Sequence, residues 1–405
     1  MNVHPLVGQL QSRSEAFVAL RRDLHQHPEL GLAEQRTSQL VAQRLAAWGY
    51  EVHQGLATTG VVGTLRRGTG AKRLGLRADM DALPIHECSG KPWSSVHAGV
   101  MHACGHDGHT AMLLAAAQHL AEQGDFDGTL HLIFQPAEEH PGGAKLMIEQ
   151  GLFERFPCDA VFAMHNMPGT PQGHFVLRDG PAMASSDDVS ITLRGVGGHG
   201  AMPHRATDPV VAAASIVMAL QTIVSRNVDP QQAAVVTVGA LQAGRANNVI
   251  PELATLELSV RSLDPDVRDL LQQRITALAQ AQAQSYGVLA KVVYRRDYPV
   301  LVNHRAETDL AREVALELVG ADRVTLQGPA LVGSEDFAVM LEYCPGSYLL
   351  IGNGAEGHPC QSPCMVHHPG YDFDDRNLPI GAAFWVRLAE RFLTHGQPIE
   401  RGECA

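Results

Sequence analysis

The hydrophobic pattern of the first 170 residues alternates between helical and strand periods. Apolar residues at helical spacing predict helices at 17–24, 40–48 and 111–122. Short apolar runs predict strands at 59–65, 73–78, 128–134 and 160–163. Helices that alternate with short apolar strands indicate an α/β domain, in which helices flank a largely parallel mixed sheet.

The pattern changes near residue 180. Residues 186–200 alternate as a half-exposed strand does, and residues 208–224 have the spacing of an amphipathic helix. Two further strands, a long helix and a last strand are predicted at 233–244, 249–262, 264–287 and 290–299. This order predicts a ferredoxin-like α+β domain. We expect it to be inserted at 184–297, between the two parts of the first domain at 1–183 and 298–405.

Composition and charge exclude several classes of protein. A chain of 405 residues with 45% hydrophobic and 18% charged residues is globular and long enough for two domains. The net charge of −12 argues against binding to nucleic acid or to an anionic membrane. No run of 18 apolar residues predicts a transmembrane helix, and the N-terminus lacks the pattern of a secretory signal.

The cysteines favour a reducing compartment. There are seven, an odd number, and they are scattered along the chain. The pair Cys360 and Cys364 lacks the spacing and the second pair of a metal knuckle, so we interpret both as structural. We therefore expect a cytoplasmic protein rather than a disulfide-stapled one.

Polar clusters stand where the predicted strands end. "RADMDALP" and "QPAEE" follow two strands, "MHNMP" follows a third, and "MHACGHDGH" directly precedes a helix. Ligands of open α/β sheets bind beyond the carboxyl ends of the strands. The four clusters are therefore expected to converge in one crevice.

The residue types in these clusters suit metal ions. The candidate ligands are a thiolate, a carboxylate and imidazoles, contributed by Cys104, His106, Glu139, His165 and either His367 or His368. Mixed sulfur, nitrogen and oxygen ligands suit zinc or its neighbours manganese, nickel and cobalt. Five ligands exceed the need of one tetrahedral ion, so we expect two ions bridged by a thiolate or a carboxylate.

Seven motifs occur together and in one order: "RADMDALP", "MHACGHDGHTAMLLAAA", "FQPAEE", "GGHGAMPH", "NNVIP", "GSEDFA" and "VHHPGYDF". Over nearly the whole chain they resemble the M20 metallopeptidase family, and most closely its subfamily D of aminoacylases, hippurate hydrolases and indole-acetyl-amino-acid hydrolases. The resemblance implies a catalytic α/β domain with two divalent metal ions and an inserted lid domain. It also implies a homodimer or dimer-based oligomer that assembles through the lid.

The resemblance assigns roles to the metal-site residues. It implies that Cys104 is the bridging ligand, at a position where the wider family has an aspartate, and that His367 is a ligand rather than His368. Glu138 matches the general base, and Asp81 matches the aspartate that orients a ligand. Asp79-Met80-Asp81 replaces the usual His-x-Asp, and His106 supplies the missing histidine. Asp107 and His109 are expected to support the ligands or the helix start.

The resemblance also assigns substrate contacts. His199 is the candidate donor to the oxyanion, from its own lid or from the neighbouring subunit. Asn248 and Arg261, which we expect on paired strands, match the residues that bind the carboxylate of the substrate. Ser334 is expected to line the acyl pocket. The implied substrate is a small N-acyl-L-amino acid, whose amide bond is cleaved by activated water with Glu138 as the base.

Three alternative functions stay open from the sequence. A metallo-carboxypeptidase or dipeptidase would use the same residues on short peptides. A cysteine hydrolase with Cys104 as nucleophile and His106 as base leaves Glu139, His165 and His367 without a role. A non-catalytic metal-dependent binding protein is disfavoured because Glu138 is present.

Overall fold

The computed structural model describes residues 4–354 and 364–394. The chain divides into two compact units: unit 1 comprises 1–180, 302–329 and 336–405, and unit 2 comprises 181–301 and 330–335. The inserted unit thus extends slightly beyond 184–297, and it also takes up Ala330–Glu335, which we expected in the first domain. Backbone pairing is the reason: Leu331 N donates to Ala182 O (2.8 Å), and Ala184 N donates to Leu331 O (3.0 Å).

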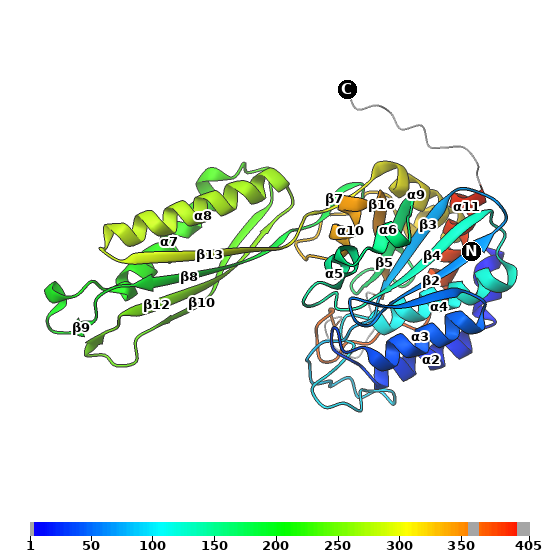
Figure 1. Cartoon of the computed structure of the whole chain (residues 1–405), viewed down its shortest axis with the longest axis horizontal. Helices are drawn as coiled ribbons and strands as arrows, with labels where there is room; N and C mark the ends of the chain where they lie inside the picture. Colours follow the sequence, from blue (N-terminus) through cyan, green and yellow to red (C-terminus); the bar gives the residue numbers. More distant parts are fainter. Residues whose placement is uncertain (1–3, 355–363, 395–405) are drawn as a thin grey trace, which may run out of the picture. The chain divides into compact units, whose positions relative to one another are not determined.

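Unit 1 is built on an eight-stranded mixed sheet (Figure 1). In sheet order its strands are β1 (Glu51–Leu56), β2 (Gly60–Arg67), β4 (Gly128–Gln135), β3 (Arg73–Asp79), β5 (Ala160–Met167), β16 (Gly346–Gly352), β6 (Phe175–Val176) and β15 (Val324–Thr325). The central strands β4, β3, β5 and β16 run parallel. They are buried along nearly their whole length, as expected for strands covered on both faces.

Helices cover this sheet. They are α1 (Pro5–Gln11), α2 (Ser14–Gln26), α3 (Gln35–Ala47), α4 (His106–Gln123), α5 (Gly143–Glu149), α6 (Leu152–Arg155), α9 (Arg305–Val319), α10 (Phe337–Tyr343) and α11 (Asn377–Thr394). The alanine-rich α4 is buried on all sides from His106 to Ala117, which matches its apolar residues around the whole helix. It packs against β3, α2, α3 and α11. The predicted α/β class is confirmed.

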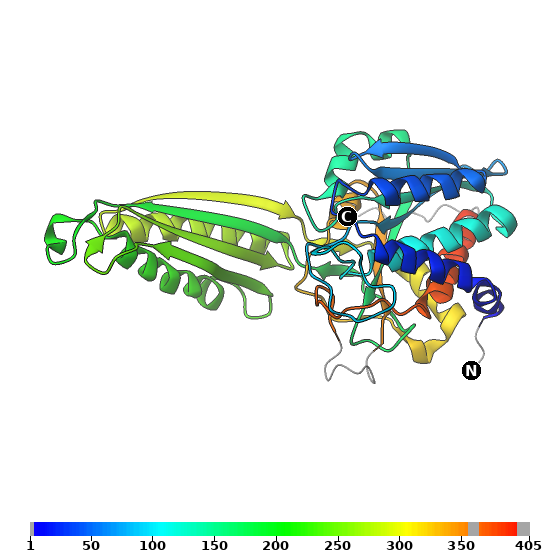
Figure 2. The same cartoon turned by 90° about the horizontal axis from the view of Figure 1, so that it is seen from below.

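Unit 2 has a four-stranded antiparallel sheet in the order β10 (Ala234–Ala243), β12 (Leu253–Ser262), β8 (Ser186–Arg194), β13 (Leu289–Tyr298). Helices α7 (Pro209–Asn227) and α8 (Pro265–Ser285) lie along one face (Figure 2). Each begins with an Asp-Pro pair, in which Asp208 or Asp264 accepts hydrogen bonds from the first amides of its helix. This is the ferredoxin-like order that the sequence predicts.

Helix α7 is long and apolar enough to pass a test for membrane spans by length and composition. Its residues Ala212, Ile216, Leu220 and Ile223 are nevertheless buried in the core of unit 2. This packing explains its apolar character as that of a helix covering a sheet.

The predicted strand at 249–262 is in fact two strands. β11 (Val249–Ile250) pairs with β9 (Gly198–His199), and β12 begins only at Leu253. Pro251 interrupts the ladder because it has no amide hydrogen to donate. Two short pieces, β7 (Gly180–Met183) and β14 (Leu301–Asn303), pair with each other where the chain passes between the units.

Five cysteines lie in the described part of the chain, and four of them are free thiols: Cys88, Cys104, Cys158 and Cys344. Cys360 and Cys404 lie outside the described residues. Cys104, one of the free thiols, belongs to a group of candidate metal ligands and is discussed below.

His131 in the middle of β4 makes the stability of unit 1 depend on pH. Its side chain is buried, and its Nδ1 lies 2.9 Å from the hydroxyl of Thr64 on β2. Burial, and then the charge of Arg73, lower the pKa of His131 to about 4. The folded state therefore favours the neutral ring. The contribution of this ring to the free energy of unfolding is fully present above the ordinary pKa of about 6.5.

We expect this stabilisation to be lost as the pH falls from about 6.5 towards 4. Between pH 7 and pH 4.5 the parent should lose about 2–3 kcal/mol more unfolding free energy than His131→Gln. Urea titrations of the chelator-treated proteins measure this without a contribution from metal release. Equal losses in the two proteins would show that His131 does not carry the acid sensitivity.

Candidate metal centre

The polar clusters meet at the carboxyl edge of the unit 1 sheet. Asp79 at the end of β3 is the register partner of Gln135 at the end of β4. His165 lies on β5 two residues beyond Ala163, the register partner of Arg77. The residues from these strand ends and from the start of α4 therefore lie at one level, as predicted from the parallel order.

Gly105 lets the chain turn into α4 directly after Cys104. It has a left-handed backbone (φ 92°), and an added Cβ would lie 2.3 Å from the side-chain nitrogen of Asn166. Only glycine fits such a turn without strain. The turn places the Cys104 thiol and the His106 ring side by side at the helix start.

Cys104 belongs to two groups of candidate ligands. In one, its sulfur lies with His106 and His165, and in the other with Glu139 and His367; within each group all ligand atoms lie within 4.8 Å of one another. The Cys104 sulfur is 3.2 Å from His165 Nε2, and His367 Nε2 is 2.9 Å from Glu139 Oε1. All five residues expected as ligands are thus brought together, with one thiol common to both groups.

The neighbouring histidine of the pair faces elsewhere. His368 Nδ1 accepts a hydrogen bond from the amide of Gly370 (3.0 Å). His367 has a left-handed backbone (φ 66°), and its amide donates to Ala103 O (2.7 Å). This contact ties the C-terminal loop to the residue preceding Cys104, so the loop presents His367 to Glu139.

Second partners orient the imidazoles. His106 Nδ1 lies 3.2 Å from Asp81 Oδ1, and His165 Nδ1 lies 2.6 Å from the carbonyl oxygen of Asn166. In each ring this leaves Nε2 for the centre, which is the usual arrangement of metal-binding histidines. His106 Nε2 is buried and has no hydrogen-bond partner among the residues that the structure describes. A buried ring nitrogen of this kind is costly unless a cation is bound there.

The charges of the site also suit cations. Burial, and then Glu139 and Glu138, raise the pKa of the Cys104 thiol well above its ordinary value. Burial opposes a charge on His106, but Asp79 and Asp81 outweigh it and raise its pKa to about 10. The surplus of carboxylates thus holds protons on the thiol and the ring. Divalent ions can take the place of these protons, since metal binding releases protons from its ligands.

Asp79 lies close to the centre, but its carboxylate is already engaged. Oδ1 lies 2.7 Å from His109 Nδ1, and Oδ2 accepts from Arg77 Nη1 (2.7 Å). His109 Nε2 in turn accepts from the amide of Asn166 (3.0 Å). Both carboxylate oxygens of Asp79 are thus in contact with side chains, and His109 connects Asp79 to the backbone of Asn166 beside His165.

Glu138 and Glu139 lie in the loop after β4, and Asp81 holds their backbone. The amide of Glu138 donates to Asp81 Oδ1 and that of Glu139 to Asp81 Oδ2, each at 3.0 Å. Glu138 is buried, and its Oε2 lies 4.0 Å from His106 Nε2. A carboxylate in this place can exchange protons with a molecule bound at the centre.

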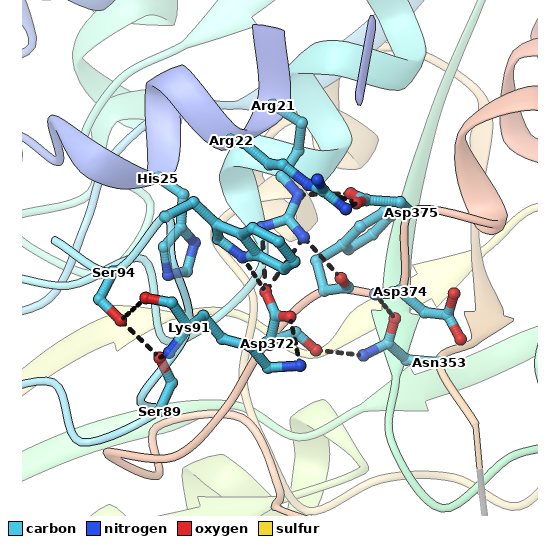
Figure 3. A network of polar contacts seen from close by, with 12 residues as sticks. Arg21, Arg22, His25, Ser89, Lys91, Ser94, Asn353, Asp372, Asp374 and Asp375 are labelled. Carbon is cyan, nitrogen blue, oxygen red and sulfur yellow. Dashed lines mark hydrogen bonds and ion pairs between the residues drawn. The ribbon is translucent and has the colours of Figure 1, made fainter. Parts of the chain in front are cut away.

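A network of buried ion pairs around Arg21, which the sequence interpretation did not include, lies beside the start of α4 (Figure 3). Arg21 on α2 is fully buried and binds Asp372, Asp375 and the carbonyl oxygen of Phe373. Asp107, next to His106, lies 2.8 Å from His25 Nδ1 and 3.5 Å from Arg21 Nη1. The network therefore joins the start of α4 to the loop that follows His367.

A sequence signal for this network was present. Arg21 and His25 occupy the same helical stripe as Phe17, Leu20 and Leu24, all of which are buried. Charged residues within an apolar stripe are rarely buried without a partner. Removing one partner of such a buried network typically lowers the free energy of unfolding by about 3–5 kcal/mol. Charged residues within the apolar stripe therefore indicate buried ion pairs that hold neighbouring segments in place.

The expected substrate residues all lie in unit 2, but in two separate places. Arg261 Nη1 donates to Ser334 Oγ (2.7 Å) near the end of β12. His199 and Asn248 lie at the other end, where β9 and β11 pair and Gly200 N donates to Asn248 O (2.8 Å). Asn248 and Arg261 are therefore not on paired strands, contrary to our expectation. The 10 residues of β12, Leu253–Ser262, are extended chain that spans roughly 30 Å from one end to the other.

The exposed ring of His199 has a defined tautomer. Its Nδ1 accepts a hydrogen bond from the amide of Ala201 (3.0 Å). A neutral ring that accepts at Nδ1 carries its hydrogen on Nε2. His199 is thus a hydrogen-bond donor through Nε2.

Comparison with known proteins defines the class. The sequence profile of peptidase family M20/M25/M40 matches residues 75–391. A hippurate hydrolase of Campylobacter jejuni is 45% identical over 97% of this chain and 100% of its own length. An N-acetyl-L-cysteine deacetylase of Bacillus subtilis is 38% identical over 95% of this chain and 90% of its own length.

The structure agrees with a solved relative. The Bacillus subtilis YXEP protein, described as a dinuclear metal binding peptidase of the M20 family, shares 32% identity and a TM-score of 0.81 over 95% of this chain and 99% of that chain. The chain belongs to peptidase family M20/M25/M40. It is a hydrolase of amide bonds that uses two divalent metal ions.

Proposed function

We propose that this protein hydrolyses N-acyl-L-amino acids, with acetyl, benzoyl or similar acyl groups, to a carboxylic acid and a free amino acid. The observation that carries the proposal is the sharing of Cys104 by two ligand groups, with Glu138 beside them. The similarity to a hippurate hydrolase and to a deacetylase supports this substrate class.

The proposed ligand set divides at Cys104. His106 and His165 would hold one ion and Glu139 and His367 the other, and Cys104, which belongs to both groups, would be a ligand common to the two. The donor set suits zinc, manganese, nickel or cobalt. When bound, two ions supply Lewis acidity and a lower pKa for water, which is the chemistry that amide hydrolysis requires.

Glu138 is the proposed general base. Its carboxylate accepts a proton from the attacking water and then delivers that proton to the nitrogen of the departing amine. Asp81 orients the His106 ring and fixes the backbone of Glu138 through hydrogen bonds. The residues of unit 1 thus provide the ligands, the base and its orientation.

Unit 2 is proposed to bind the substrate. Arg261 binds the α-carboxylate, since its fork matches a carboxylate, and Ser334, already bonded to Arg261, lines the acyl pocket. His199 donates from Nε2 to the oxyanion, and Asn248 beside it contacts the substrate.

Arg261 and Ser334 lie at one end of β12, and His199 and Asn248 lie at the other. This separation supports a substrate site to which a second chain contributes residues. A small N-acyl amino acid does not span the length of β12, so it does not reach Arg261 and His199 of one chain together. We therefore propose a homodimer or dimer-based oligomer that assembles through unit 2, in which His199 and Asn248 act in trans. The exposed edge strands β10 and β13 and the apolar exposed residues Val211 and Met218 of α7 offer surfaces for such an assembly.

A cysteine hydrolase is a poor match to the site. The thiol of Cys104 lies 3.2 Å from His165 Nε2, whereas His106, the base of that scheme, has its Nδ1 beside Asp81. The raised pKa of the thiol also disfavours a thiolate nucleophile without a metal. A dipeptidase would use the same chemistry, so the substrate panel below includes dipeptides. The free thiols and the acidic charge support a cytoplasmic location.

The first test concerns Glu138. Metal-reconstituted parent enzyme should release amine from a panel of N-acetyl- and N-benzoyl-amino acids, lose activity with a chelator, and regain it with added metal. Glu138→Gln should retain the metal but lose about 10²–10⁴-fold in kcat, because an amide does not accept the proton. Activity of the variant within about tenfold of the parent, at equal metal content, would contradict the base assignment.

The second test concerns Arg261. Arg261→Ala should raise KM for N-acyl amino acids by about tenfold or more, as the loss of a charge-assisted contact of about 1.5–3 kcal/mol implies. The corresponding amino-acid amides, which lack the carboxylate, should be turned over almost unchanged. Initial rates with both substrate series separate the two cases, and equal losses would indicate a structural role.

The third test concerns action in trans. Inactive Glu138→Ala and His199→Ala proteins are mixed under conditions that allow subunit exchange. Random exchange makes about half of the dimers mixed, each with one complete site, so activity should recover to roughly a quarter of the parent. Verified exchange without recovery would place His199 in cis, because each site then carries one lesion.

A further inference from the structure

Glu34, in the loop between α2 and α3, is a fully buried carboxylate that the roles above leave unused. Its Oε1 accepts from the amide of Ala137 (2.9 Å), and its Oε2 accepts from the hydroxyl of Thr59 (2.6 Å). Ala137 immediately precedes Glu138 and Glu139. Glu34 therefore contacts the loop that carries the proposed base and one proposed ligand.

The carboxylate of Glu34 is not needed to start α3. Glu34 stands at the N-cap position, but within the described part of the chain its side chain makes no capping hydrogen bond. Glu29, five residues earlier, does this work instead: Oε1 accepts from Arg36 N and Oε2 from Thr37 N, each at 2.9 Å. A helix start therefore does not account for burying Glu34.

The loop after β4 has a conformation that needs support. Ala137 has a left-handed backbone (φ 52°), which costs a residue with a Cβ about 1–2 kcal/mol. The Glu34 loop packs tightly on it, since a Cβ on Gly31 would lie 2.4 Å from His140 O and 3.0 Å from the Cβ of Ala137. Without Glu34, the Ala137 amide would be buried without an acceptor, and the loop would relax.

Three successive amides of this loop end on carboxylates. Ala137 N donates to Glu34, and Glu138 N and Glu139 N donate to Asp81. The peptide groups on both sides of Ala137 and Glu138 are therefore fixed from two different elements. Together, the carboxylates of Glu34 and Asp81 restrict the orientation of the Glu138 and Glu139 side chains more than either carboxylate would alone.

We propose that Glu34 is a positioning residue, which holds Ala137 so that Glu138 points at the reacting molecule and Glu139 at its ion. The proposal rests on the proposed function for the part that concerns catalysis. The part that concerns Glu139 can be measured without any substrate, as the affinity for metal.

The test compares four proteins. Glu34→Ala removes both hydrogen bonds, and Glu34→Asp keeps the charge but shortens the reach to Ala137. Glu34→Gln keeps an oxygen for Ala137 and offers an amide to Thr59, whose hydroxyl can also accept. Glu29→Ala is the matched control, because Glu29 lies in the same loop and its carboxylate accepts the amides of Arg36 and Thr37 in α3, not the amide of Ala137.

We expect Glu34→Ala and Glu34→Asp to lose roughly 10–100-fold in kcat with KM nearly unchanged, as a misplaced base does. Titration calorimetry with zinc or manganese should show at least about tenfold weaker binding of one of two ions, the range for loss of a supporting contact. Glu34→Gln should restore both quantities to within about threefold of the parent. Glu29→Ala should lower the melting temperature but leave kcat and metal binding unchanged.

Two results would overturn the proposal. One is parent-like kcat and metal binding in folded Glu34→Asp or Glu34→Ala, and the other is an equal loss in Glu29→Ala. If Glu34→Ala does not fold, Glu34→Asp decides. If the parent turns over no N-acyl amino acid, the proposed function fails, and the metal titrations of the same four proteins still test the positioning of Glu139.

Discussion

The carboxylate of Asp81 is the contact on which the arrangement of the metal centre depends. With two oxygens it reaches the His106 ring and the amides of Glu138 and Glu139. One side chain thus couples the start of α4 to the loop after β4, and through them a proposed ligand to the proposed base. Because the His106 ring and the Glu138 amide are buried, their hydrogen bonds to Asp81 are stronger than they would be in water, and their loss is correspondingly costly.

Around this contact the protein balances a dense set of buried charges. Arg77 faces Asp79, and Arg21 faces Asp107, Asp372 and Asp375. Carboxylates are still in excess near Cys104 and His106. Burial, and then these carboxylates, raise the pKa of Cys104, and the carboxylates raise the pKa of His106 against the effect of burial. A site with this surplus of negative charge has room for divalent cations, and the cations in turn make the burial of the carboxylates tolerable.

The supporting residues come from the N-terminal segment, far from the site in sequence. Arg21 and His25 on α2 hold the α4 start and the loop after His367, and Glu34 holds the loop after β4. Positioning and chemistry are therefore divided between segments. This division explains why the N-terminal segment, which supplies no proposed metal ligand, contains the buried charged residues Arg21, His25 and Glu34.

The sequence by itself determined the helices and strands of the two units and the types of donor atom in the metal site. Hydrophobic periodicity predicted the α/β unit, the inserted ferredoxin-like unit and the strand ends at which the polar clusters lie, because burial of one face imposes that period. Motif order over the whole chain, together with the donor types at Cys104, His106, Glu139, His165 and His367, indicated the family and two metal ions.

Only the tertiary structure decided which charged positions are buried and how far apart the substrate residues lie. The predicted helix at 111–122 begins at His106, because its first turn is polar and buried against partners that the apolar period does not reveal. Arg21 and His25 stand in the apolar stripe of their helix, but only the fold shows which residues they bind. Glu34 looks like a surface residue in the sequence and is buried in the fold. Pro251 breaks the predicted strand at 249–262, and the straight β12 then separates Asn248 from Arg261. Such facts depend on contacts between distant segments, and local sequence patterns carry no information about those contacts.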